Sequence, residues 1–172
     1  MDLNHINLPA SLIADLYKNH LIEISNPETV QVIPTDTNLK KNIQYLGKNK
    51  KGVCLLVSYA HDVYLPEGAL NFLTTILQAC KLNLGDTAII NCYHQKISFL
   101  DMKEQLSFHY LLIFGVAPVQ IGLHEIPLFS IATDSDCNIV YSPAAEQLNN
   151  SDPESKMLKS KLWVCLKQLF GI

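Results

Sequence analysis

Three short apolar runs, separated by segments long enough to form helices, constrain this fold more than any other feature. The runs are VCLLV, TAIINC and YLLIFGV, at residues 53–57, 87–92 and 110–116. A strand that is apolar at every position is typical of a parallel sheet covered on both faces. Strands that alternate with helices favour such a sheet over a sandwich. We therefore expect an α/β fold with three layers, α/β/α, around a mostly parallel central sheet of four or five strands.

Amphipathic segments supply the expected helices. Apolar residues recur on one side of a helix that includes Ala69 to Cys80, and SFLDMKEQL (98–106) predicts a second helix. IPLFSIA and NIVY add one or two strands around the turn TDSDC. SPAAEQL and DPESKMLKSKLWVCLKQLF then end the chain as helices, each with a polar cap before a first-turn proline: Ser142–Pro143 and Asp152–Pro153.

The N-terminal part is predicted to contribute less to the sheet. Pro9 opens a helix, LIEI (21–24) forms a short strand, and the polar stretch Ser25–Gly52 is a long loop with one edge strand, TVQVI. With 172 residues, of which 48% are hydrophobic and 17% charged, the chain 1–172 is expected to fold as a single domain.

The cysteines and the chain's apolar segments indicate a reducing, cytoplasmic setting. The five cysteines are odd in number, form no C-x-x-C pair, and lie mostly in apolar runs, as reduced core thiols do. The N-terminus lacks the pattern of a secretory signal. Because no apolar run approaches the roughly 20 residues that cross a bilayer, we expect no membrane contact.

The formal charge of −3 gives no overall reason to expect nucleic-acid binding. Two local basic clusters lack the interleaved aromatics that base stacking needs, so we interpret both as solvated faces. A weak contact to nucleic acid or to an acidic peptide is the alternative. The clusters are Lys40, Lys41, Lys48, Lys50 and Lys51 in the early loop, and Lys156, Lys159, Lys161 and Lys167 on the last helix.

The loop Ser58–Pro66 is the natural place to look for chemistry, because it follows a buried strand and precedes a helix. Pro66 removes one N–H from the helix start and Glu67 repels an incoming phosphate there, so a phosphate site is disfavoured. His61 and Asp62 are candidate acid–base groups, but a polar loop carries such residues by default. The histidines show no metal-ligand spacing. We predict no catalytic residue, metal site or cofactor.

The C-terminal half resembles the uracil-DNA glycosylase fold. LLIFGVAP (111–118) is a strand ending in aromatic-glycine, and VYSPAAEQL (140–148) is similar to the His-Pro-Ser-Pro segment of those enzymes. Ser142 and Pro143 match its Ser-Pro, but Val140 stands in place of the catalytic histidine and Tyr141 in place of the first proline. The acid-proline turn expected near Ser58 is also missing. Cleaving a flipped base needs both groups, so glycosylase activity is not expected.

Over nearly its whole length the chain is similar to the psi subunit family of bacterial DNA polymerase III, which shares this frame without catalysis. The similar features are LIADLYKNHLIEISNP near the N-terminus, the strand, Asp-containing loop and helix from 55 to 77, and the Ser-Pro helix that leads to a terminal helix with Trp163. The resemblance implies a scaffold that links the clamp loader to single-stranded DNA-binding protein or its partner.

Two other interpretations stay open. One is an enzyme or a base-binding protein that uses a cleft between the loop Ser58–Pro66 and the segment Val140–Pro143; the other is an interaction protein of unrelated role. A deep cleft with a converging acid and histidine favours chemistry, whereas a cleft filled by tyrosines favours a scaffold. The candidate cleft residues are Ser58, Tyr59, His61, Asp62, Tyr64, Tyr141, Ser142 and Pro143.

Overall fold

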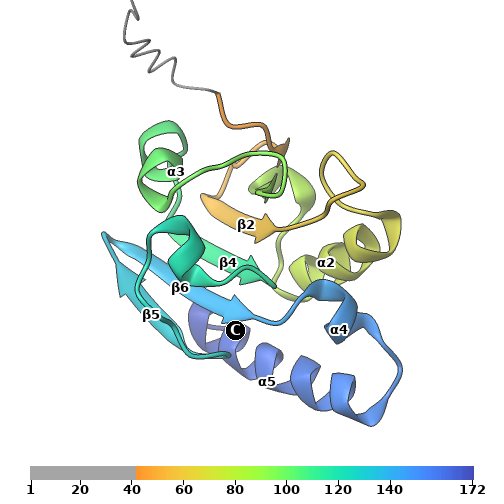
Figure 1. The fold of residues 1–172 in the computed structure, drawn as a ribbon. Helices are drawn as coiled ribbons and strands as arrows, with labels where there is room; N and C mark the ends of the chain where they lie inside the picture. Colours follow the sequence, from red (N-terminus) through yellow and green to blue (C-terminus); the bar gives the residue numbers. More distant parts are fainter. Residues whose placement is uncertain (1–41) are drawn as a thin grey trace, which may run out of the picture. The chain divides into compact units, whose positions relative to one another are not determined.

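A computed structural model describes residues 42–172, which form a six-stranded sheet with four helices (Figure 1). The predicted N-terminal helix and the strands LIEI and TVQVI lie outside the described residues. The strands are β1 (Leu46–Gly47), β2 (Val53–Val57), β3 (Thr87–Asn91), β4 (Tyr110–Phe114), β5 (Ile131–Asp134) and β6 (Cys137–Ser142). The helices are α2 (Glu67–Ala79), α3 (Phe99–Gln105), α4 (Ala145–Asn149) and α5 (Pro153–Phe170).

The sheet is mixed and mostly parallel, with the strand order β1-β3-β2-β4-β6-β5. β3, β2, β4 and β6 run parallel to one another, while β1 and β5 pair antiparallel at the two edges. The predicted α/β class and mostly parallel sheet are thus confirmed. The expected number of four or five strands was too low, because β1 is a two-residue strand inside a polar stretch that carries no strand pattern.

The three predicted apolar runs form the centre of the sheet. Every residue of β2 and β3 is buried, and so are the last four of β4, which is why these strands read as continuously apolar. The chain passes from β2 through α2 to β3 on one side, then through α3 across β2 to β4 on the other. The connections therefore diverge between β2 and β4, where α/β sheets most often place their ligands.

Helices pack against both faces of the sheet. Buried residues of α2, α4 and α5 share one core cluster with Leu55 and Val57, whereas Phe99 and Met102 of α3 share the other with Cys54. The helical spacing predicted for α2 is confirmed, since Ala69, Leu73, Leu77 and Cys80 are buried there. A reciprocal capping box between Ser98 and Asp101 begins α3.

Two predicted boundaries near the C-terminus were wrong. Ser142 does not cap a helix: it is the last residue of β6, and α4 begins at Ala145 after an Ala144 that has no capping side chain. The turn TDSDC is shorter than expected, because only Ser135 and Asp136 lie between β5 and β6. Both have positive φ, +46° and +59°, as a two-residue hairpin turn requires. Asp152 does stand at the N-cap of α5, before Pro153.

Candidate functional site

A buried amide organises the loop that follows β2. Asn91 is the last residue of β3 and is fully buried. Its Nδ2 donates hydrogen bonds to the backbone carbonyls of Tyr59 and Asp62, each at 2.8 Å. Its Oδ1 accepts from the backbone N–H of Tyr59 at 2.9 Å and of Tyr93 at 3.1 Å. One side chain thus fixes the loop after β2 relative to the loop after β3.

Further contacts tie the ends of these two parallel strands together. The backbone N–H of Cys92 donates to the carbonyl of Val57 at 2.9 Å, which extends the pairing of β2 and β3 by one residue. The Ser58 side chain lies beside the Cys92 thiol, whose pKa is raised by burial.

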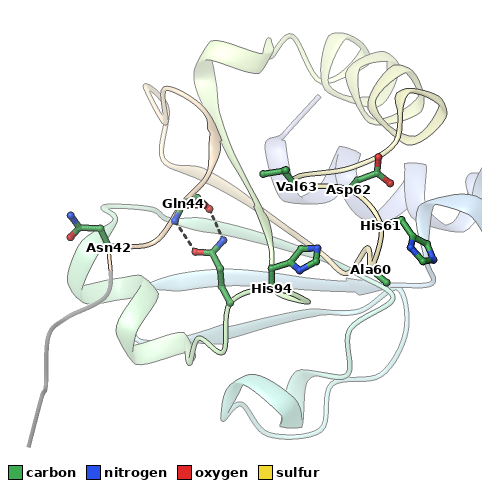
Figure 2. A pocket seen from close by; sticks show the side chains of 8 residues that line it. Asn42, Gln44, Ala60, His61, Asp62, Val63 and His94 are labelled. Atoms are coloured by element: carbon green, nitrogen blue, oxygen red, sulfur yellow. Dashed lines mark hydrogen bonds between the residues drawn. The ribbon is translucent and has the colours of Figure 1, made fainter. Parts of the chain in front are cut away.

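The fixed loop forms one wall of a polar recess of about 470 Å³ at the carboxyl ends of β2 and β3 (Figure 2). The other walls come from the segment before β1 and the loop after β3. There Gln44 and Gln95 pair reciprocally: the backbone N–H of Gln44 donates to Oε1 of Gln95 at 2.8 Å, and Nε2 of Gln95 donates to the carbonyl of Gln44 at 2.9 Å. The recess is lined by Asn42, Gln44, Ala60, His61, Asp62, Val63, His94 and Gln95.

The titratable side chains that line this recess do not contact one another directly. Figure 2 shows the side chains of His61 and Asp62 pointing away from each other. Within residues 42–172, neither a hydrogen bond nor an ion pair joins His61, Asp62 or His94 to another of the three. The recess can hold a small polar group, but it does not assemble an acid–base pair.

The opposite side of the loop is closed by Tyr59. Its half-buried phenol lies beside the carboxylate of Glu146 at the start of α4. Burial and the neighbouring carboxylates of Glu146 and Asp62 together raise the pKa of the phenol. Tyr59 therefore stays neutral and bridges the loop after β2 to the helix after β6.

A close backbone approach narrows the same side of the sheet. Gly115, directly after β4, has φ +69°, and a Cβ placed there would lie 2.8 Å from the Cβ of Ala144. Only glycine lets the turn after β4 and the segment before α4 come so near. Two contacts, Tyr59 with Glu146 and Gly115 with Ala144, thus join loops at the carboxyl ends of β2, β4 and β6.

The eight predicted cleft residues are distributed over different environments. His61 and Asp62 line the recess, whereas Tyr64 packs against the core on the α2 side and Tyr141 against the core on the α3 side. Tyr141 and Ser142 are neighbours in β6, so their side chains leave the strand on opposite faces. Ser142 is buried, and Pro143 connects it to α4.

The sequence analysis did not single out the residues that build the recess on the β3 side. Asn91 ends an apolar run. A polar residue at the carboxyl end of a buried strand could have pointed to it, because a buried amide needs several hydrogen-bond partners. His94 and Gln95 carried no comparable signal. The segment around Gln44 reaches the recess because β1 pairs with β3, and the sequence did not predict β1.

Two further observations on the described residues concern metal binding and membrane spanning. Within residues 42–172, no set of three histidine, cysteine or acidic side chains is grouped as a metal site. No helix in this part of the chain has the length and apolar character to cross a bilayer.

Comparison with known proteins places the chain in no family. Its sequence matches no protein-family model, and no curated protein is significantly similar to it.

Proposed function

We propose that this chain is a non-catalytic accessory protein of DNA replication, resembling the psi subunit of DNA polymerase III. In this proposal it has the three-layer, uracil-DNA glycosylase-like form of the α/β fold and acts in the cytoplasm. It links the clamp loader to single-stranded DNA-binding protein, or to that protein's partner, through protein contacts.

The observation that supports a scaffold is the closure between the loop after β2 and the segment after β6. A base-cleaving enzyme on this frame needs an open pocket there with a converging acid and imidazole. Tyr59 instead bridges to Glu146, and Gly115 packs against Ala144. Val140, where the resemblance would require an imidazole, is buried in the core.

The test is reconstitution with purified proteins. The chain is mixed with the clamp-loader subunits and single-stranded DNA-binding protein of its own organism, and complexes are separated by size-exclusion chromatography. We expect co-elution with at least one of them. A uracil-release assay on single- and double-stranded DNA runs in parallel, and we expect no release. Absence of any complex, or release of uracil, contradicts the proposal.

The recess beside His61 favours one alternative, a base-binding protein or an enzyme with a divergent pocket. Its volume of about 470 Å³ lies within the range of small-molecule sites, and the side-chain amide of Asn42 could pair with the edge of a base. This alternative predicts that free bases or nucleosides shift the backbone amide NMR signals of Ala60, Val63 and Gln95, which line the recess. Saturable shifts that a His61→Ala/His94→Ala variant abolishes would favour it over the scaffold.

A further inference from the structure

The outward face of α5 carries large apolar side chains that the sheet does not cover. Met157 and Val164 are each 62% exposed, and Trp163 is 37% exposed. The inward face of the same helix is well packed through Leu162, Cys165 and Leu166. Met157 and Val164 are seven residues apart and so lie on one stripe, about 10.5 Å from each other along the helix axis.

Lysines flank this stripe without forming ion pairs to residues 42–172. After Glu154, α5 contains four lysines and no acidic residue. In the part of the chain that the structure describes, none of these lysines makes an ion pair; Lys159 donates only to the backbone carbonyl of Asn150, at 3.3 Å. By contrast, Lys51 in the other basic cluster is paired with Asp86 at 3.6 Å. Lys159 also lies near Asp152, whose pKa it helps to lower, whereas no ion pair to a described residue is found for Lys156, Lys161 or Lys167.

The helix brings together residues that look unrelated along the sequence. Residues three, four and seven apart share a face, so Lys156, Lys159 and Lys167 surround Trp163. Lys161 lies on the other flank, beyond Val164 and Met157. In the sequence, the one tryptophan simply stands among lysines. On the helix, these residues form an apolar stripe with a positively charged border, which extends about 16 Å from Lys156 to Lys167.

We propose that this α5 face, defined by Met157, Trp163 and Val164 with Lys156, Lys161 and Lys167, docks an acidic segment of a partner protein that also carries apolar side chains. Tryptophan is the residue most enriched at interface hot spots, and the lysines supply complementary charge for steering. The inference rests on the proposed scaffold role and names the chemistry of one partner contact.

The same charges could attract nucleic acid, but the composition of the face favours a peptide. Met157 and Val164 occupy the centre of the exposed face, and aliphatic side chains offer bases no stacking surface. Only one aromatic residue is exposed on the helix, and the chain as a whole carries a charge of −3. An acidic segment with apolar anchors satisfies both the stripe and its border.

The experiment uses the single tryptophan of the chain as its reporter. The full-length protein is titrated with a synthetic helix-forming peptide of about 12 residues, long enough to span the face, that combines aspartate and glutamate with leucine and phenylalanine. Trp163 emission and the anisotropy of a labelled peptide are both followed. We expect saturable binding that weakens as salt rises, together with a blue shift of Trp163 emission.

A charge-matched pair of variants locates the site. Lys156→Glu/Lys161→Glu/Lys167→Glu should weaken peptide binding roughly tenfold or more, as the loss of three exposed charge pairs predicts. Lys48→Glu/Lys50→Glu/Lys96→Glu makes the same change in net charge at exposed sites off α5, and should alter binding less than about twofold. Met157→Ser/Val164→Ser tests the contribution of the apolar stripe. Leu100→Ala is its control, because it removes a similarly exposed apolar side chain from α3.

Several outcomes overturn the proposal: no binding of the peptide, equal loss in both lysine variants, or binding of a thymidine oligonucleotide in preference to the peptide. The reconstitution assay separates this failure from that of the scaffold role. If the α5 triple variant still co-elutes with its replication partner as the parent protein does, the α5 face is wrong and the scaffold stands. If neither the parent protein nor the α5 triple variant forms a complex with a replication protein, but the peptide binds on α5, the scaffold role is wrong and the α5 face stands.

Discussion

Replacing Asn91 should destabilise this protein more than any surface change, because one side chain satisfies two loops at once. The four shortest hydrogen bonds of its amide measure 2.8, 2.8, 2.9 and 3.1 Å and reach Tyr59, Asp62 and Tyr93. With each intramolecular hydrogen bond worth about 1 kcal/mol net, Asn91→Ala should lower the free energy of unfolding by about 3–4 kcal/mol. For a domain of this size that corresponds to a fall in Tm of roughly 10 °C.

A second substitution separates hydrogen bonding from packing. Asn91→Asp keeps the shape and both acceptor contacts but cannot donate at neutral pH. It would leave the carbonyls of Tyr59 and Asp62 facing a buried carboxylate. We expect a loss at least as large as that of Asn91→Ala. Asn71→Ala, at an exposed position of α2, is the control and should change stability by no more than about 0.5 kcal/mol.

The assay is urea unfolding followed by circular dichroism and by Trp163 fluorescence, with hydrogen exchange to locate the effect. Exchange should quicken first in the loop after β2, residues 58–63, whose backbone Asn91 holds. If Asn91→Ala lowers the unfolding free energy by less than about 1 kcal/mol and leaves this loop protected, Asn91 does not organise the site as we argue.

Three further predictions follow from single contacts. Gly115→Ala should lower the free energy of unfolding by about 3 kcal/mol, because of the positive φ and the collision with Ala144. Gly122→Ala, with φ +83° and open space around it, should lower it by only about 1–2 kcal/mol. Equal losses of stability in thermal unfolding would show that the collision with Ala144 contributes nothing. Ser142→Ala should be neutral or stabilise by up to about 1 kcal/mol, because no described residue hydrogen-bonds to this buried hydroxyl; a clear loss in urea unfolding would reveal a partner. Burial raises the pKa of the Cys80 and Cys137 thiols from 9.0 to about 11, so these thiols ionise first in the unfolded chain and the free energy of unfolding should fall between pH 9 and 11. The Cys80→Ala/Cys137→Ala variant should show a shallower fall with pH. An unchanged dependence on pH would refute the assignment of the fall to these two thiols.

Continuous apolar runs allowed the centre of the fold to be predicted without a structure. β2, β3 and β4 are buried on both faces, so their sequences carry no polar alternation, and the helices between them show their inward faces through spacing alone. The edges were less predictable. β1 has only two residues, and its pairing with β3 depends on backbone contacts that no side-chain pattern records.

The site divides in the same way. The sequence marked His61 and Asp62 because they follow a buried strand, and the structure places them at the rim of a recess. Tyr141 and Ser142 also follow from the pattern, but only the alternation of β6 decides that they leave on opposite faces. Asn91 and Gln95 escaped attention because their importance lies in partners far away in the chain.

The amino-acid sequence by itself determined the class of fold, the central strands and the periodicity of α2 and α5, because burial on one or two faces imposes a local repeat of apolar residues. Tertiary structure alone decided that Tyr59 reaches Glu146, that Gly115 admits Ala144, and that Met157 and Val164 of α5 stay exposed. Such contacts join residues that are distant along the chain or spaced around a helix. Their energies depend on distance and solvent exposure, which the order of residues does not record.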